Sequence, residues 1–175
     1  MTNTIAILGS TGSIGRQTLD VVRELGLRVA ALTANASVER MEAQVREFQP
    51  ALAVLTNETA AAELRVRLAD TETKVLSGEE GLLAAATLPQ ADTVLTAVVG
   101  MVGLKPTLAA IREGKRIALA NKETLVCAGE LVMAAADRYG AEIVPVDSEH
   151  SAIFQFGCCK ASSLVTGCNS AAFRP

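Results

Sequence analysis

The 175 residues of this chain provide length for one α/β domain and little more. Half of the residues are apolar, which is enough for a core, and 16 basic residues against 19 acidic ones give a net charge of −3, which argues against nucleic acid as a partner. No apolar run approaches the ~18 residues of a membrane span, and residues 1–5 carry no basic leader, so we expect a cytoplasmic protein that contacts no membrane.

Short apolar stretches alternate along the chain with longer stretches of helical periodicity. The expected strands are Ile5–Leu8, Arg28–Leu32, Leu52–Leu55, Lys74–Leu76, Thr93–Val99, Arg116–Leu119 and Glu142–Val146. The expected helices are Ile14–Leu25, Val38–Phe48, Thr59–Leu68, Glu79–Ala86, Gly103–Gly114 and Glu130–Tyr139. This alternation is typical of parallel strands joined by right-handed crossovers. The sequence therefore predicts a single α/β domain with a doubly wound, mostly parallel, Rossmann-like sheet over residues 1–155.

The first expected helix shows the pattern most clearly. Its apolar side is formed by Ile14, Val21, Val22 and Leu25, and Gly26 is placed where a helix ends in a left-handed residue. Residues 156–175 show neither the apolar periodicity of a helix nor the alternation of a strand. They hold three of the four cysteines and no acidic residue. We therefore treat residues 156–175 as an atypical tail.

Cysteine chemistry does not dominate this chain. Its cysteines are Cys127, Cys158, Cys159 and Cys168, and none forms a Cys-x-x-Cys pair. Because there is also a single histidine, a zinc site is not supported, and we expect reduced, unpaired thiols.

A glycine-rich loop lies between the first strand and the first helix. Gly9, Gly12 and Gly15 allow a sharp turn and leave backbone N–H groups open to a pyrophosphate at the positive end of a helix dipole. The spacing is Gly-x-x-Gly-x-x-Gly, which differs from the common NAD fingerprint. The alternative is a tight turn that binds nothing, but the strand before and the helix after favour a dinucleotide.

The end of the second strand bears on which dinucleotide is bound. NAD enzymes usually place an acidic residue there to hold the ribose 2′-hydroxyl. Residues Leu32–Ser37 contain no carboxylate to repel a 2′-phosphate, so NADP is favoured over NAD. Arg40 is the nearest cation, inside the next helix.

Two further polar clusters follow later strands, at the edge of a parallel sheet where ligands bind. Lys122, between Asn121 and Glu123, would provide a cation for an anionic or carbonyl-bearing substrate, although a solvated surface lysine is the ordinary alternative. Asp147 and Glu149 point the same way in an extended chain and suit Mg²⁺ or Mn²⁺, unless they belong to a solvated loop or Glu149 only caps the following helix. For His150, next to them, we expect a structural hydrogen bond.

Four motifs in chain order resemble the 1-deoxy-D-xylulose 5-phosphate reductoisomerase family. They are Ile7–Gly15 with Thr18–Val22, Pro106–Ile111, Ala120–Val126 and Pro145–Gln155. They run from residue 4 to residue 155, about nine-tenths of the chain. The resemblance implies conversion of 1-deoxy-D-xylulose 5-phosphate to 2-C-methyl-D-erythritol 4-phosphate in non-mevalonate isoprenoid biosynthesis, by a metal-assisted rearrangement followed by hydride transfer from NADPH.

The resemblance also implies roles for individual residues. The NADPH contacts would be Thr11, Gly12, Ser13, Ile14, Asn121 and Glu123. The phosphorylated sugar substrate would contact Lys122, Ser148 and Glu149, and the divalent metal would bind to Asp147 and Glu149. Lys122 and Glu149 are the catalytic candidates. The family further implies a homodimer.

The chain departs from the family pattern at two places. Ala36 stands where many members carry a basic residue, and residues 156–175 do not reproduce the family's continuation. The tail is therefore a remnant of, or a substitute for, the start of the catalytic domain. Because another metal-binding glutamate and the phosphate-binding residues of the family cannot be assigned, we expect this chain alone to be incomplete for catalysis. The alternative is a non-catalytic NADPH-binding module.

Overall fold

The computed structural model describes residues 4–146, except for the side chains of Lys122 and Leu125. Its strands are β1 (Thr4–Leu8), β2 (Arg28–Ala34), β3 (Leu52–Leu55), β4 (Lys74–Ser77), β5 (Thr93–Thr96), β6 (Arg116–Leu119) and β7 (Ile143–Pro145). Its helices are α1 (Ser13–Leu25), α2 (Val38–Phe48), α3 (Glu58–Arg67), α4 (Gly78–Ala86), α5 (Leu104–Arg112) and α6 (Lys122–Tyr139), with a 3₁₀ turn, η1 (Gly100–Gly103).

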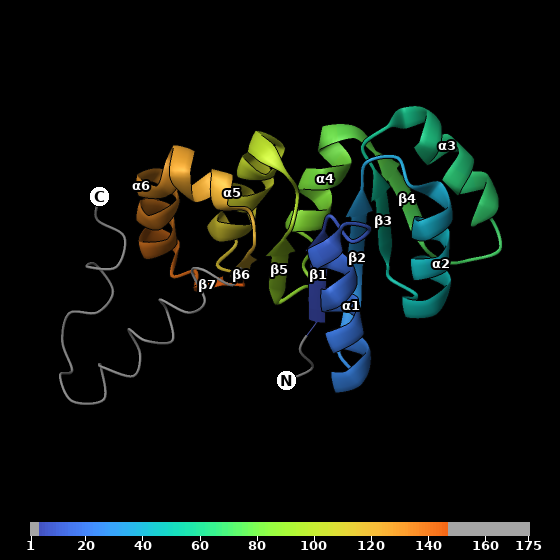
Figure 1. Cartoon of the computed structure of the whole chain (residues 1–175), viewed down its shortest axis with the longest axis horizontal. Helices are drawn as coiled ribbons and strands as arrows, with labels where there is room; N and C mark the ends of the chain where they lie inside the picture. The colour runs from blue at the N-terminus through green and yellow to red at the C-terminus, as the bar shows by residue number, and fades with distance from the viewer. Residues whose placement is uncertain (1–3, 147–175) are drawn as a thin grey trace.

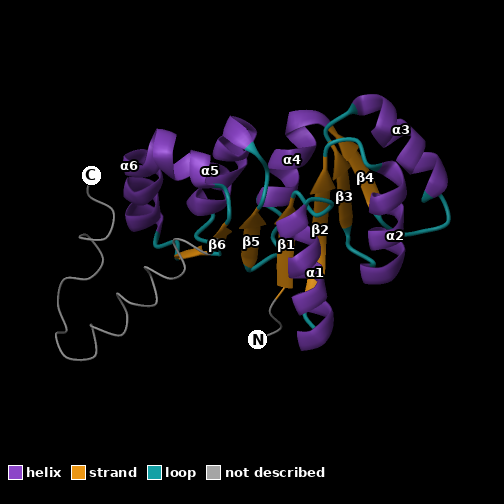
Figure 2. Ribbon diagram, viewed as in Figure 1, coloured by secondary structure: helices purple, strands orange, loops and turns teal. Residues whose placement is uncertain are grey.

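The strands within residues 4–146 form one sheet in the order β4-β3-β2-β1-β5-β6-β7, and every neighbouring pair is parallel (Figure 2). The predicted doubly wound, Rossmann-like α/β class is confirmed. The described sheet is entirely parallel rather than mostly parallel, because a crossover helix precedes each strand after the first.

Helices cover both faces of the sheet (Figure 1). Ala6 and Leu8 of β1 pack in the core that α4, α5 and α6 share, whereas Ile7 packs with α1, α2 and α3. In β3, likewise, Leu52 packs in the first of these cores and Ala53 in the second. Because successive side chains of a strand point to opposite faces, consecutive apolar residues in the central strands build both cores.

The direction in which the sheet grows reverses after β4. The chain first adds β2, β3 and β4 outward from β1, and α4 then returns across the other face so that β5 pairs with the free side of β1. The loops that leave the carboxyl ends of β1 and β5 therefore run to opposite faces. Such a point of reversal is where open α/β sheets form a ligand crevice.

Three details of the sequence prediction need correction. β5 ends at Thr96 instead of Val99, because the chain leaves the sheet to enter η1. α6 begins already at Lys122 instead of Glu130, although Ala128 departs from helical geometry with φ −142° and ψ 25°. The polar start of α6 resembles a loop in sequence, and a side-chain cap makes it helical.

The third correction concerns the apolar side of α1. Leu19 and Val22 are its buried large side chains, whereas Val21 and Leu25 of the expected side are exposed. The end of α1 at Gly26 is confirmed, with the glycine in the left-handed region at φ 62°.

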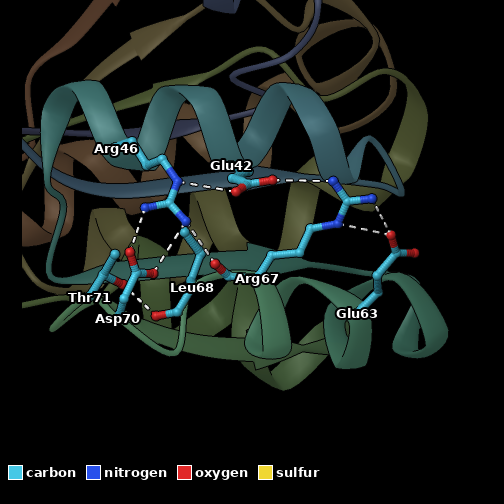
Figure 3. A network of polar contacts seen from close by, with 7 residues as sticks. All are labelled: Glu42, Arg46, Glu63, Arg67, Leu68, Asp70 and Thr71. Carbon is cyan, nitrogen blue, oxygen red and sulfur yellow. Dashed lines mark hydrogen bonds and ion pairs between the residues drawn. The ribbon is translucent and has the colours of Figure 1, made fainter.

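On the surface, α2 and α3 are joined by a network of ion pairs (Figure 3). Arg46 donates to Glu42 at 3.1 Å and to Asp70 at 2.8 Å, and Arg67 donates to Glu42 at 3.2 Å and to Glu63 at 2.6 Å. Glu42 therefore accepts from both arginines, which fixes the two helices against each other on one face of the sheet.

The predictions on membrane spans, cysteines and the domain boundary can be compared with this fold only in part. None of the helices in residues 4–146 has the length and apolar character that crossing a membrane requires. Cys127 is exposed as a free thiol. The other cysteines and the expected domain boundary at residue 155 lie outside the described residues, so those predictions remain untested.

Candidate functional site

Two glycines of the first loop are required by the fold itself. Gly9 has φ +95°, and a Cβ there would lie 2.6 Å from the carbonyl oxygen of Ala97. At Gly15, a Cβ would overlap the carbonyl oxygen of Gly9 and lie 2.6 Å from Ser10 Cα. The loop can therefore pass this close to β5 and to the first turn of α1 only without side chains at these positions.

Gly12 is different, because the fold does not require a glycine there. It is the N-cap of α1 with φ −72° and ψ 176°, a conformation open to any residue, and a Cβ would meet only Gly9 O at an ordinary 3.5 Å. No side chain caps the first turn of α1. A missing side chain at this point leaves room for an anion to approach the free N–H groups of the helix terminus.

Hydrogen bonds hold the glycine loop in place before any ligand is present. The carbonyl oxygen of Thr33 in β2 accepts from Gly9 N at 3.0 Å and from Ser10 N at 2.8 Å. Ser10 Oγ donates to Gln44 Oε1 at 2.7 Å, and Gln44 Nε2 donates back to Ser10 O at 3.0 Å. β2 and α2 therefore fix the loop, so ordering it adds little to the cost of binding.

A cavity of about 360 Å³ opens at the carboxyl edge of the sheet, at the point where the strand order reverses. Its lining comes from the glycine loop, the ends of β2 and β3, α4, and the segment after β5: Gly9, Thr11, Gly12, Thr33, Ala34, Asn35, Thr56, Leu82, Ala97, Val98, Val99 and Val102. Thr56 Oγ1 donates to Asn35 Oδ1 at 2.8 Å. None of these lining residues is a carboxylate, which favours an anionic group at the β2 end.

A larger hollow of about 940 Å³ lies at the opposite, amino edge of the sheet, where Arg28, Gln49 and Glu72 are among its lining residues. Its size exceeds that of the carboxyl-edge cavity, but α2 presents its carboxyl end to it through the C-cap Gln49. Because a helix carboxyl terminus carries partial negative charge, this hollow suits a phosphate poorly. We assign the candidate site to the smaller cavity.

The structure brings together some of the predicted cofactor residues. Thr11 and Gly12 line the cavity, and Ser13 and Ile14 follow directly as the exposed and half-buried start of α1. Glu123 is half-buried in the first turn of α6.

Asn121 is 2% exposed, and its side chain is fully engaged within the protein. Its Nδ2 donates to Val98 O at 2.6 Å and to Gly100 O at 2.8 Å, and its Oδ1 accepts from Thr124 N at 3.1 Å. Asn121 thus joins the cavity lining to the first turn of α6.

The remaining predicted site residues are not placed. The side chain of Lys122 is outside the described part, and so are Asp147, Ser148, Glu149 and His150. Within residues 4–146, histidine, cysteine and acidic side chains form no group of three that could hold a metal ion. The metal prediction rests on Asp147 and Glu149 and is not tested by this fold.

The cavity lining after β5 was not expected from the sequence. Val98 and Val99 were assigned to the end of an expected strand and Val102 to no element, whereas all three belong to a connection that leaves the sheet. Two glycines, Gly100 and Gly103, follow Val99 and Val102 and interrupt this apolar run, which provided a signal that a buried strand would not continue through it.

The comparison with known families gives a match over most of the chain. The model of the family described as 1-deoxy-D-xylulose 5-phosphate reductoisomerase matches residues 5–129. A protein named 1-deoxy-D-xylulose 5-phosphate reductoisomerase from Desulfitobacterium hafniense (strain DSM 10664 / DCB-2) is 56% identical over 153 residues, which cover 86% of this chain and 40% of that protein. The chain thus spans about 40% of the length of this relative.

Solved structures agree with the sequence match. The 1-deoxy-D-xylulose 5-phosphate reductoisomerase from Zymomonas mobilis in complex with NADPH superimposes with a TM-score of 0.85 at 43% identity, over 89% of this chain and 41% of that one. A DOX-P reductoisomerase in complex with NADPH, fosmidomycin and magnesium gives a TM-score of 0.84 at 45% identity, over 87% of this chain and 38% of that one.

Proposed function

Because the chain belongs to the 1-deoxy-D-xylulose 5-phosphate reductoisomerase family, we propose that it binds NADPH in the carboxyl-edge cavity as the cofactor-binding part of such an enzyme. The observation that carries the proposal is Gly12, a glycine that the fold does not need at the open N-terminus of α1. Its missing side chain fits the close approach of a pyrophosphate to backbone N–H groups.

The cofactor would lie across the point of reversal in the sheet. Its pyrophosphate would be held by Thr11, Gly12, Ser13 and Ile14, and its 2′-phosphate would lie at the β2 end, where Thr33 and Asn35 offer polar groups without a carboxylate. This lining supports NADPH over NADH. Contacts from Asn121 and Glu123 are carried over from the family resemblance.

NADPH, when bound, supplies the hydride for the reduction. The substrate proposed for the complete enzyme is 1-deoxy-D-xylulose 5-phosphate, with Lys122, Ser148 and Glu149 as its contacts. Asp147 and Glu149 would bind Mg²⁺ or Mn²⁺, for which carboxylate oxygens are suitable ligands. Lys122 would place a cation next to the anionic substrate. Lys122 and Glu149 remain the proposed catalytic residues.

A second candidate function is an NADPH-binding module without turnover of its own. The described cavity is lined entirely by residues 9–102, whereas the assigned substrate and metal residues lie at position 122 and beyond 146. The lining of the cavity is therefore separate along the chain from the assigned substrate and metal residues, although the proposed contacts from Asn121 and Glu123 flank Lys122. We propose that these 175 residues bind NADPH and do not by themselves convert the substrate.

Titration of the purified chain with NADPH, and separately with NADH, tests the binding proposal. We expect saturable one-to-one binding of NADPH and weaker binding of NADH, whereas tighter binding of NADH would contradict the assignment of the 2′-phosphate. Addition of Mn²⁺ and 1-deoxy-D-xylulose 5-phosphate then tests turnover. Loss of NADPH absorbance at a rate typical of enzymes would refute the second candidate function.

A further inference from the structure

One lining segment of the cavity, Val98–Gly103, has an unusual surface. Val99 is 84% exposed and Val102 is 58% exposed, and both line the cavity. Val98 packs against the hydrophobic core, but side chains as exposed as Val99 and Val102 gain little from burial, so apolar packing does not explain the shape of the rest of the segment.

Hydrogen bonds to backbone carbonyls hold this segment instead. Asn121 Nδ2 donates to Val98 O at 2.6 Å and to Gly100 O at 2.8 Å, on either side of exposed Val99. Gly103 O accepts from Thr107 Oγ1 at 2.7 Å. The connection between β5 and α5 is therefore fixed by side chains of α5 and of the α6 cap.

The side-chain amide of Asn121 is engaged inside the protein. Both Nδ2 hydrogens and the Oδ1 atom have partners inside the protein, and the side chain is almost fully buried. Gly103 lies against it, since a Cβ there would be 2.7 Å from Asn121 Nδ2. The fold thus keeps space at Gly103 for the amide.

We propose that Asn121 is a positioning residue, which holds Val98–Gly103 as a preformed side of the NADPH cavity and fixes it to the first turn of α6. The inference rests on the proposed function and deepens it. Because Asn121 is adjacent to Lys122, the cofactor cavity and this proposed substrate contact share one support. A preformed cavity side spares the ordering cost that a loose loop adds to binding.

The test uses the whole chain and three substitutions. N121S keeps an oxygen for the helix cap and removes both donors to the segment. G103A keeps Asn121 but places a methyl group against its Nδ2, which should displace the amide from the two carbonyls. N57S is the matched control, because Asn57 caps α3 by the same bond to Ala60 N at 2.9 Å and does not line the cavity. Each variant is measured for its dissociation constant with NADPH, its melting temperature and amide hydrogen exchange.

We expect N121S to raise the dissociation constant for NADPH about tenfold and to speed the amide exchange of residues 98–103. G103A should raise the dissociation constant for NADPH by a similar factor. The double variant should bind NADPH with the same affinity as the single variant that binds it less tightly, because both changes break the same contacts. N57S should lower the melting temperature without changing NADPH affinity.

Unchanged affinity in N121S, or effects of N121S and G103A that multiply, would overturn the positioning role. If the unsubstituted chain binds no NADPH, the proposed function fails. The exchange of residues 98–103 still decides whether Asn121 holds the segment, and an exchange rate unchanged in N121S would overturn the inference whatever the chain binds.

Discussion

Two segments that line the cavity are held in different ways. The glycine loop after β1 is fixed by its own glycines and by backbone bonds to Thr33 in the neighbouring strand. The Val98–Gly103 segment after β5 depends on Asn121, a side chain from beyond the next strand. The first shape is local and visible in sequence, whereas the second is created by the tertiary fold.

Side chains that donate to backbone carbonyls of another segment fix the chain at both ends of β5. Lys115 and Asn121 flank β6, which pairs with β5 in parallel. Lys115 Nζ donates to Leu88 O at 2.7 Å and to Ala91 O at 2.6 Å before β5, and Asn121 holds the chain after it. Side chains at both ends of one strand therefore fix the connections of its neighbour.

The largest effect should come from filling the space at Gly15. Because a Cβ there overlaps the backbone of Gly9 and Ser10, we expect G15A to lower the free energy of unfolding by about 3 kcal/mol or more. Urea denaturation measures this loss. G129A is the control, since its Cβ would have no neighbour within 4 Å, and it should not destabilise the chain. Equal stability of G15A and G129A would show that the loop is not sterically fixed.

Removal of the support before β5 should have a smaller effect. K115M keeps the length of the side chain but leaves the carbonyl of Ala91 without its donor, so the free energy of unfolding should fall by about 1–3 kcal/mol. K105M replaces a lysine that forms only an exposed ion pair with Glu79 and serves as the control in the same denaturation series. A loss in K105M as large as that in K115M would contradict the role of the buried donor.

A substitution at Gly12 should change NADPH binding but not folding, in contrast to Gly9 and Gly15, which the fold requires. We expect G12A to melt at the temperature of the unchanged chain and to bind NADPH about tenfold more weakly, because the methyl group occupies the approach of the pyrophosphate. Calorimetric titration and thermal unfolding measure the two quantities. If G12A instead loses stability and keeps its affinity, Gly12 serves the fold and not a ligand.

Stability at alkaline pH tests Lys115 in another way. Burial lowers the pKa of Lys115 below its ordinary value, and the nearby Glu113 and Asp92 oppose this only in part. Between the lowered pKa and the ordinary value, unfolding takes up a proton, so the stability contributed by this group should rise with pH across that window. The unfolding free energy of the unchanged chain relative to K115M should therefore grow there. A flat or falling difference would refute the lowered pKa.

The exposed network between α2 and α3 should matter least. R46M removes the bonds to Glu42 and Asp70 and should cause a small loss of melting temperature that salt diminishes, with unchanged NADPH affinity. Hydrogen bonding to Arg46 lowers the pKa of Asp70, so this contribution is present at neutral pH and should disappear as the pH falls through that lowered pKa. A change of NADPH affinity in R46M would contradict the separation of this network from the cavity.

The sequence predicted the parts of the site whose causes are local. Gly9 follows an apolar strand, Gly15 lies in the first turn of an amphipathic helix and Gly26 marks the end of that helix, so the turn could be found from neighbouring residues alone. The path of Val98–Gly103 could not, because it depends on hydrogen bonds from Asn121 across more than twenty residues of chain. The start of α6 was missed for a local reason, since its cap is a bond from Thr124 N to Asn121 Oδ1 only three residues away. A polar Asn-Lys-Glu run has the same composition in a loop and in a capped helix.

The proposed site for NADPH is the glycine loop at the carboxyl edge of the sheet. Titration of the isotope-labelled chain with NADPH, followed by the NMR signals of its backbone amides, shows where the cofactor binds. We expect saturable shifts concentrated at residues 11–14, 33–35 and 97–102. Shifts confined to the larger amino-edge hollow, around Arg28, Gln49 and Glu72, or no shifts at all, would contradict it.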